Sequence, residues 1–260
     1  RQALDLRHAV LTREVRFRDT AGRTTALTQH RFVALDQAHV AALQTTIVAE
    51  DWSGTLEIRS TIDGDVRNSL VERYRDLSSE HLESLETREL SEHSVVLSAR
   101  TNQSRIEIAV AARTRLWRND SAVPAAYRFI DGDGEVGHLI TVEASIGDAV
   151  TAEKTVTVFT SRDTAISEPV DAAGLWVDRL GRFAELRAGH ETAWSHLWER
   201  MSIELGGHEE DLKVIRLHLL HLLQSVALNS PDLDAGVPAR GLHGEAYRGL
   251  IFWDELFIFP

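Results

Sequence analysis

The first 165 residues repeat one pattern, in which apolar and polar side chains alternate over short stretches. Along residues 11–18, Leu11, Val15 and Phe17 share one face, and the even-numbered positions are polar or charged. Because successive side chains of a strand point to opposite faces, this pattern predicts a strand with one face in water. The same period of two recurs at 55–59 and 106–110, and further candidate strands lie at 94–99, 138–144 and 155–160.

Turn-forming residues separate these stretches. Glycine stands beside alanine, aspartate or isoleucine at 21–22, 63–65, 131–134 and 146–148. Many half-buried strands at short spacing are typical of an antiparallel sandwich. We therefore expect residues 1–165 to form a large N-terminal β-sandwich, so that the chain is mainly β with a helical C-terminal part.

One of these turns carries acidic residues. Asp131, Asp133 and Glu135 surround two glycines, as at the start of a calcium-binding EF-hand loop. The glutamate that completes such a loop and the two flanking helices are absent from the sequence here. A solvated hairpin tip is the preferred interpretation, and we expect no metal site.

Residues 165–205 change from a strand pattern to a helix pattern. Pro169 and Gly174 mark the change, and apolar residues then follow at helical spacing from Trp176 to Ala184. Residues 190–200 place Trp194, Leu197 and Trp198 on one face. We expect two helices in a linker over 166–206, with their tryptophans as packing anchors rather than ligand contacts.

A long helix is predicted over 209–228, after the break at Gly206 and Gly207. Its apolar stripe consists of Leu212, Ile215, Leu219, Leu222, Leu223 and Val226. Three acidic residues at 209–211 suit the positive end of the helix dipole. His218 and His221 lie three residues apart, but we find no carboxylate on the same face, and packed or interfacial histidines are favoured over a metal site.

Composition excludes several classes of protein. The 260 residues carry 28 basic and 40 acidic side chains, a net charge of −12, which argues against a nucleic-acid-binding surface. There is no cysteine, and therefore no disulfide or thiolate metal site. We see neither an apolar run that would span a membrane nor a signal peptide, so a cytoplasmic location is the default expectation. No cofactor is expected.

The densest stretch lies at 241–257, with three glycines and several aromatic and charged residues. Trp253 stands beside Asp254, and an indole face next to a carboxylate offers a sugar ring an apolar wall and a hydrogen-bond acceptor. The alternative is a buried aromatic residue beside a helix-capping aspartate, and on chemistry alone this alternative is favoured. Tyr247 and Arg248 either line the same site or brace its loop.

This stretch resembles the start of the catalytic domain of glycoside hydrolase family 65, the maltose, trehalose, kojibiose and nigerose phosphorylases and their hydrolase relatives. The resemblance is carried by Gly244-Glu245-Ala246-Tyr247-Arg248-Gly249 and Phe252-Trp253-Asp254-Glu255. It extends upstream through 218–225 and 193–198, and more loosely through 11–15, 31–33 and 51–54. Leu250 departs from the pattern, since a histidine is expected there.

The resemblance implies a fold and a reaction. Residues 207–260 would begin an (α/α)6 catalytic barrel, and the full protein would cleave an α-linked glucose disaccharide with inorganic phosphate, with inversion, to β-glucose 1-phosphate and glucose. Trp253 and Asp254 would bind the glucose ring that is cleaved. The general acid would be a glutamate downstream, so no catalytic residue is expected in this chain, and Glu255 is not assigned that role.

Alternatives remain at this point. A hydrolase of the same family, acting for example on trehalose, would use a base outside this chain, and a non-catalytic carbohydrate-binding sandwich would have no chemistry at all. The chain begins at Arg1 and ends at Pro260, directly after the densest motif, and reads as an N-terminal fragment that is inactive alone. The expected partners are the disaccharide and phosphate, with a homodimer as a candidate assembly and neither nucleic acid nor membrane as a partner.

Overall fold

The computed structural model describes the chain except for residues 68–75, 133, 202, 227–235, 239, 242–248, 254 and 256–260. It divides into two compact units, the first made of Arg1–Leu4 and Val10–Gly189, the second of Asp5–Ala9 and His190–Pro260. Within the described residues, no helix combines the length and the apolar character that crossing a bilayer requires.

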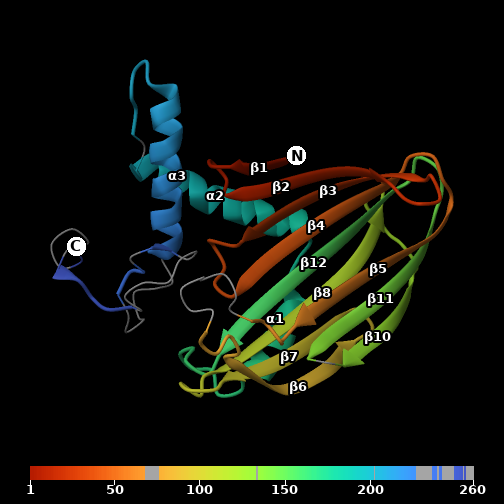
Figure 1. Ribbon diagram of the computed structural model, residues 1–260, viewed down its shortest axis with the longest axis horizontal. Helices are drawn as coiled ribbons and strands as arrows, with labels where there is room; N and C mark the ends of the chain where they lie inside the picture. Colours follow the sequence, from red (N-terminus) through yellow and green to blue (C-terminus); the bar gives the residue numbers. More distant parts are fainter. Residues whose placement is uncertain are drawn as a thin grey trace. The chain divides into compact units, whose positions relative to one another are not determined.

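Antiparallel strands form most of the first unit (Figure 1). The strands are β1 Gln2–Asp5, β2 Val10–Arg18, β3 Thr24–Val33, β4 Val40–Ala49, β5 Gly54–Asp63, β6 Leu82–Ser91, β7 Ser94–Thr101, β8 Glu107–Arg118, β9 Ser121–Ala122, β10 Ala126–Gly132, β11 Glu135–Ala144 and β12 Ala149–Thr160. In the described part of the chain they build a nine-stranded sheet, ordered β1-β2-β3-β4-β12-β8-β7-β6 with β9 on β8, and a three-stranded sheet ordered β10-β11-β5. The predicted mainly β fold is confirmed.

The two sheets pack face to face around an apolar layer. On the large sheet, Val95, Leu97 and Ala112 are buried against Val136 of β11. A second cluster places Leu116 of β8 against Ile140 of β11. Burial of these side chains removes apolar area from water, which is the main favourable term in folding.

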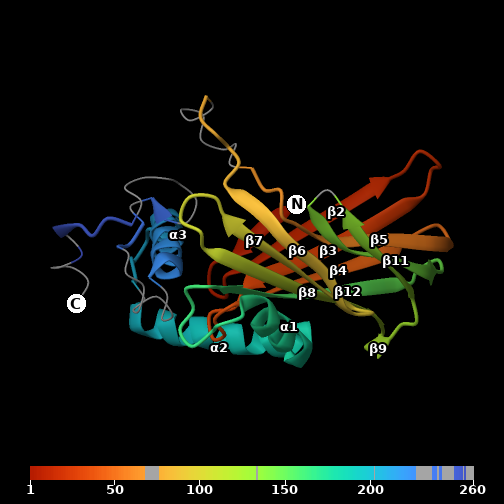
Figure 2. The ribbon, with the colours of Figure 1, turned by 90° about the horizontal axis from the view of Figure 1, so that it is seen from below.

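Helix α1, Pro169–Arg179, covers the other face of the large sheet (Figure 2). Its Ala173 and Val177 are fully buried against Ala109, Ala111 and Phe159. The strands in the middle of the large sheet are therefore covered on both faces. For this reason the first six residues of β7 are all buried. A simple alternating pattern would instead leave every second residue exposed to water.

The predicted strands are present, with different limits and with neighbours that the alternation did not predict. The structure adds β1, β3, β4, β6, β9 and β10. In β2 the most buried residue is Val10, at 2% exposure, while Phe17 on the predicted apolar face is 47% exposed. Val10 is covered because it packs with Phe183 and Leu186 at the start of α2.

The helical part begins close to the predicted position. Pro169 occupies the first turn of α1, where its missing N–H costs no hydrogen bond, and α2 spans Phe183–Met201. The break between them lies at 180–182, inside the first predicted helix. The third helix, α3, spans Glu209–Ser225, and the end of the predicted helix at 227–228 lies outside the described residues.

Candidate functional site

The structure describes one of the four predicted site residues. Trp253 is 68% exposed, so its indole is open to solvent in the second unit. Tyr247, Arg248 and Asp254 lie outside the described residues. The predicted pairing of Trp253 with Asp254 therefore stays a prediction.

Glu255, next to that motif, links two parts of the loop that carries it. One carboxylate oxygen accepts a hydrogen bond from the Phe252 N–H at 3.2 Å, and the other accepts one from the Val237 N–H at 3.0 Å. A carboxylate that bridges two backbone segments is engaged in holding the loop. Sequence reasoning did not foresee this contact, because nothing in the order of residues relates position 237 to position 255.

Gly236 makes the close approach of these segments possible. Its N–H donates to the Gly249 carbonyl at 2.8 Å, and a Cβ at this position would lie 2.5 Å from the Leu250 carbonyl oxygen. Gly249 has a φ of +76°, which favours glycine. Two of the glycines in this part of the chain thus hold the backbone in a shape that other residues would strain.

A cavity of about 240 Å³ lies between α3 and residues 237, 238, 240 and 241 of the same unit. His218, His221 and Arg240 line it with two imidazoles and a guanidinium. Ser225 also lines it, but its hydroxyl donates to the His221 carbonyl at 2.9 Å. The cavity offers donors to a ligand rather than a carboxylate that could act as an acid.

Among the described residues, no group of three His, Asp or Glu side chains that could hold a metal ion gathers around these histidines or elsewhere. Leu220 and Leu223 are the buried residues of α3, whereas Leu222 and Val226 are each 38% exposed. Leu220 was not in the predicted apolar stripe.

The acidic side chains of the predicted hairpin tip have partners within the protein. Asp131 accepts a hydrogen bond from the Thr87 hydroxyl at 2.7 Å, and Glu135 pairs with Arg59.

A buried charged cluster, which we call the helix-break cluster, lies in the first unit. It consists of Arg113, Glu153 and Arg182 with Trp117. Arg113 donates to the carbonyls of Asp178 at 2.9 Å and Leu180 at 2.7 Å, at the end of α1. Burial lowers the pKa of the Arg113 guanidinium.

Glu153 contacts the other side of the break between α1 and α2, where α2 begins. Its carboxylate accepts from Arg182 at 2.9 Å and from the Phe183 N–H at 3.3 Å, at the start of α2. The hydrogen bond with Glu153 raises the pKa of Arg182, whose guanidinium lies 3.8 Å from the centre of the Trp117 ring. The cluster was not predicted, although charged residues at alternate positions of a strand that is otherwise rich in alanine are a signal for it.

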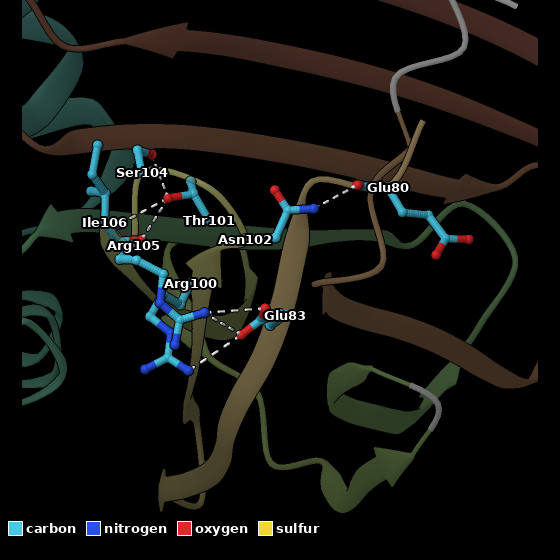
Figure 3. A network of polar contacts seen from close by, with 8 residues as sticks. All are labelled: Glu80, Glu83, Arg100, Thr101, Asn102, Ser104, Arg105 and Ile106. Carbon is cyan, nitrogen blue, oxygen red and sulfur yellow. Dashed lines mark hydrogen bonds and ion pairs between the residues drawn. The ribbon is translucent and has the colours of Figure 1, made fainter. Parts of the chain in front are cut away.

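A second group, the turn network, lies between β6 and the β7–β8 turn (Figure 3). Glu83 accepts hydrogen bonds from Arg100 at 3.2 Å and from Arg105 at 3.1 Å. The Thr101 hydroxyl accepts from the Ile106 N–H at 2.8 Å. Most polar atoms of these side chains are paired within the network, although Arg100 Nε has no hydrogen-bond partner among the described residues, and we interpret the turn network as a brace for the turn.

Comparison with known proteins gives matches along nearly the whole chain. Residues 1–197 match the model of the glycosyl hydrolase family 65 N-terminal domain, and residues 216–260 match that of the family 65 central catalytic domain. The exposed Trp253, Glu255 and the α3 cavity fall in the second match.

Three curated relatives illustrate the range of sequence identity and of named activity among the matches. An uncharacterized glycosyl hydrolase of Mycobacterium tuberculosis is 52% identical over all of this chain and 20% of its own length. A kojibiose phosphorylase of Halothermothrix orenii is 31% identical over 99% of this chain and 33% of its own. A trehalose 6-phosphate phosphorylase of Lactococcus lactis is 29% identical over 99% of this chain and 32% of its own length. The chain thus spans about a fifth to a third of the length of these relatives.

A solved structure shows the same fold. It is that of a human-microbiome protein named provisionally as a kojibiose phosphorylase, with a TM-score of 0.75 and 18% identity over 98% of this chain and 32% of that one. The N-terminal sandwich followed by the start of a helical domain is therefore the arrangement that the two share. On the strength of the match over residues 1–197, the chain belongs to glycosyl hydrolase family 65.

Proposed function

We propose that this chain is the N-terminal part of an inverting phosphorylase that cleaves an α-linked glucose disaccharide with inorganic phosphate. The observation that carries the proposal is the match of residues 216–260 to the family's catalytic domain model, together with relatives named as kojibiose, nigerose and trehalose 6-phosphate phosphorylases. We further propose the boundaries 1–165 for the sandwich, 166–206 for the linker and 207–260 for the start of an (α/α)6 barrel.

In this reaction a phosphate oxygen attacks the anomeric carbon while the bond to the leaving sugar oxygen breaks. A carboxylic acid protonates that oxygen, and attack from the opposite face inverts an α-linkage into β-glucose 1-phosphate. Phosphate arrives as an anion, so it needs no base. The acid is expected beyond residue 260, and the 260 residues alone are predicted to be inactive.

Trp253 and Asp254 are proposed to bind the glucose ring that is cleaved. The 68% exposure of the indole supports a role that needs an open aromatic face. Tyr247 and Arg248 are proposed to line the same site. Glu255 has a different place, because both its oxygens are engaged with backbone N–H groups.

A hydrolase is the second candidate, favoured by the relative at 52% identity, which is named as a glycosyl hydrolase. In that case water replaces phosphate, and a base activates it. The two reactions differ in their need for phosphate and in their products.

The test uses the complete gene product with trehalose, trehalose 6-phosphate, maltose, kojibiose and nigerose, with and without phosphate. Phosphate-dependent release of β-glucose 1-phosphate from one sugar supports the phosphorylase and names its substrate. Equal release of glucose without phosphate supports the hydrolase, and turnover of none of these sugars contradicts both reactions.

The Asp254→Asn variant is expected to lose at least 100-fold in kcat/KM, the scale of losing two strong hydrogen bonds to the sugar.

A further inference from the structure

A cavity of about 140 Å³ lies at the helix-break cluster, lined by β8, β12 and residues 180–185. Its lining on the sheet comes from residues in register, with Glu153 opposite Arg115 and Thr155 opposite Arg113. Trp117 follows on β8, opposite Thr151. Residues two apart in a strand share a face, so these polar side chains all point to the helix-covered side of the large sheet.

The residues that line this cavity carry more guanidinium groups than carboxylates. Among the lining residues, three guanidinium groups face two carboxylates; they belong to Arg113, Arg115, Arg182, Glu153 and Glu185, and Arg182 also pairs with the exposed Asp120 at 3.3 Å. The Glu153 carboxylate is engaged with Arg182 and with the start of α2. The Arg113 guanidinium is engaged with carbonyl oxygens at the end of α1, which carry only partial negative charge.

Two polar atoms of the cavity-lining residues have no hydrogen-bond partner within the described part of the chain. They are Trp117 Nε1 and Thr155 Oγ1, and Thr155 is only 3% exposed. A buried polar group without a partner is costly, roughly 1–3 kcal/mol in proteins. An indole N–H can only donate, so the missing partner must supply an acceptor.

The size of the cavity limits that partner. At about 30 Å³ per water, it holds roughly five waters or one small ion. Waters alone would satisfy the two atoms, whereas an anion would in addition pair with the guanidinium of Arg115, which is exposed to solvent.

We propose that this cavity is a binding site for a small oxyanion of the phosphate or sulfate class. The Trp117 indole and the Thr155 hydroxyl donate to the anion, and Arg115 supplies the opposite charge. The site lies in the sandwich, among residues of the first unit, and shares no residue with the motif at 241–257. Its occupancy would tie the α1–α2 break to the sheet beneath it.

The test follows Trp117 directly, by fluorine NMR of the full-length protein labelled with 5-fluorotryptophan. The Trp117 resonance is identified as the one that the Trp117→Phe variant lacks. Inorganic phosphate and sulfate are expected to shift it saturably, and glycerol, which is neutral, is expected not to. Because the readout is local to Trp117, phosphate bound at a catalytic site elsewhere does not produce it.

Three variants separate the anion site from bound water or a change in folding. Thr155→Val is expected to weaken phosphate binding roughly tenfold or more, and Thr155→Ser to restore it. Thr114→Val is the matched control, since Thr114 lies on the opposite face of β8 and bonds Ser60 at 2.8 Å; its affinity should equal that of the unmodified protein. A resonance that does not move, moves equally with glycerol, or responds identically in Thr155→Val would overturn the proposal.

Discussion

The helix-break cluster and the turn network use the same residue types in opposite surroundings. Arg113 and Glu153 are each 5% exposed, whereas the side chains of Glu83 and Arg105 are 45% and 53% exposed. Water screens the second pair, so its attraction is worth little. In the helix-break cluster Arg113 and Glu153 have lost most of their water and depend on the partners that the fold provides. Burial, rather than the number of ion pairs, should therefore decide which group matters to stability.

Replacement of Arg113 is the strongest test of that comparison. Arg113→Met is expected to lower the free energy of unfolding by about 3–5 kcal/mol, because the carbonyls at the end of α1 lose the charged donor that the buried Arg113 supplies. Urea denaturation followed by circular dichroism measures the change. Arg115→Met is the control on the same face of β8; since Arg115 is exposed, we expect a change within about 0.5 kcal/mol in buffer free of phosphate and sulfate. Equal effects of the two variants would contradict the role of burial.

Glu153→Gln should have the next largest effect. It keeps the size of the side chain but removes the charge that faces Arg182, whose side chain is 32% exposed and can recover some hydration. We expect a loss of about 2–3 kcal/mol, below that of Arg113→Met. Scanning calorimetry of the variant measures it, and an unchanged transition temperature would show that Arg182 does not depend on Glu153.

Tyr127, a neutral and partly buried group, sharpens the comparison because its contribution to stability depends on pH. Burial raises the pKa of Tyr127 to about 12, against about 10 in an unfolded chain. The folded state holds this proton more tightly, so the contribution of Tyr127 to stability is complete below pH 10 and falls as pH rises toward 12. We expect the stability difference between the protein and Tyr127→Phe to change over that window by less than about 2 kcal/mol. Denaturation curves at pH 9, 10 and 11 give the slope, and a constant difference would contradict the prediction.

The turn network should give the smallest effect. Glu83→Gln removes the charge that Arg100 and Arg105 share at the surface, and we expect a loss of about 1 kcal/mol or less. Raising the salt concentration should reduce even that difference, since exposed pairs are screened. A loss as large as that of Glu153→Gln would mean that exposure does not separate the two groups.

The strand pattern illustrates what local sequence can predict. In β5, Leu56 and Ile58 are half-buried and the residues between them are exposed, as the alternation predicts. In β7 the first six residues are all buried, because α1 and the three-stranded sheet cover the strand from both sides. An alternating sequence predicts a strand with one face in water. It does not predict a strand such as β7, in which a second layer covers that face as well.

The predicted site shows a similar division. The family relationship of the segment was recognisable from contiguous motifs and is confirmed, whereas the sugar-binding chemistry assigned to Trp253 stays a prediction. The bridge from Glu255 to Val237 was not predictable, since it depends on a loop that brings these two positions together. The roles of Tyr247, Arg248 and Asp254 stay predictions, because these residues lie outside the described part of the chain.

The sequence by itself determined the mainly β character of the first 165 residues, the change to helices near Pro169 and the family, because these follow from periodicity and from contiguous motifs. Tertiary structure alone decided that Arg113 and Glu153 meet opposite ends of the α1–α2 break, and that a cavity with unpaired donors lies beside them. The reason is physical: partners such as Arg113 and Leu180 are 67 positions apart. Only the packing of helix on sheet brings them within hydrogen-bonding distance.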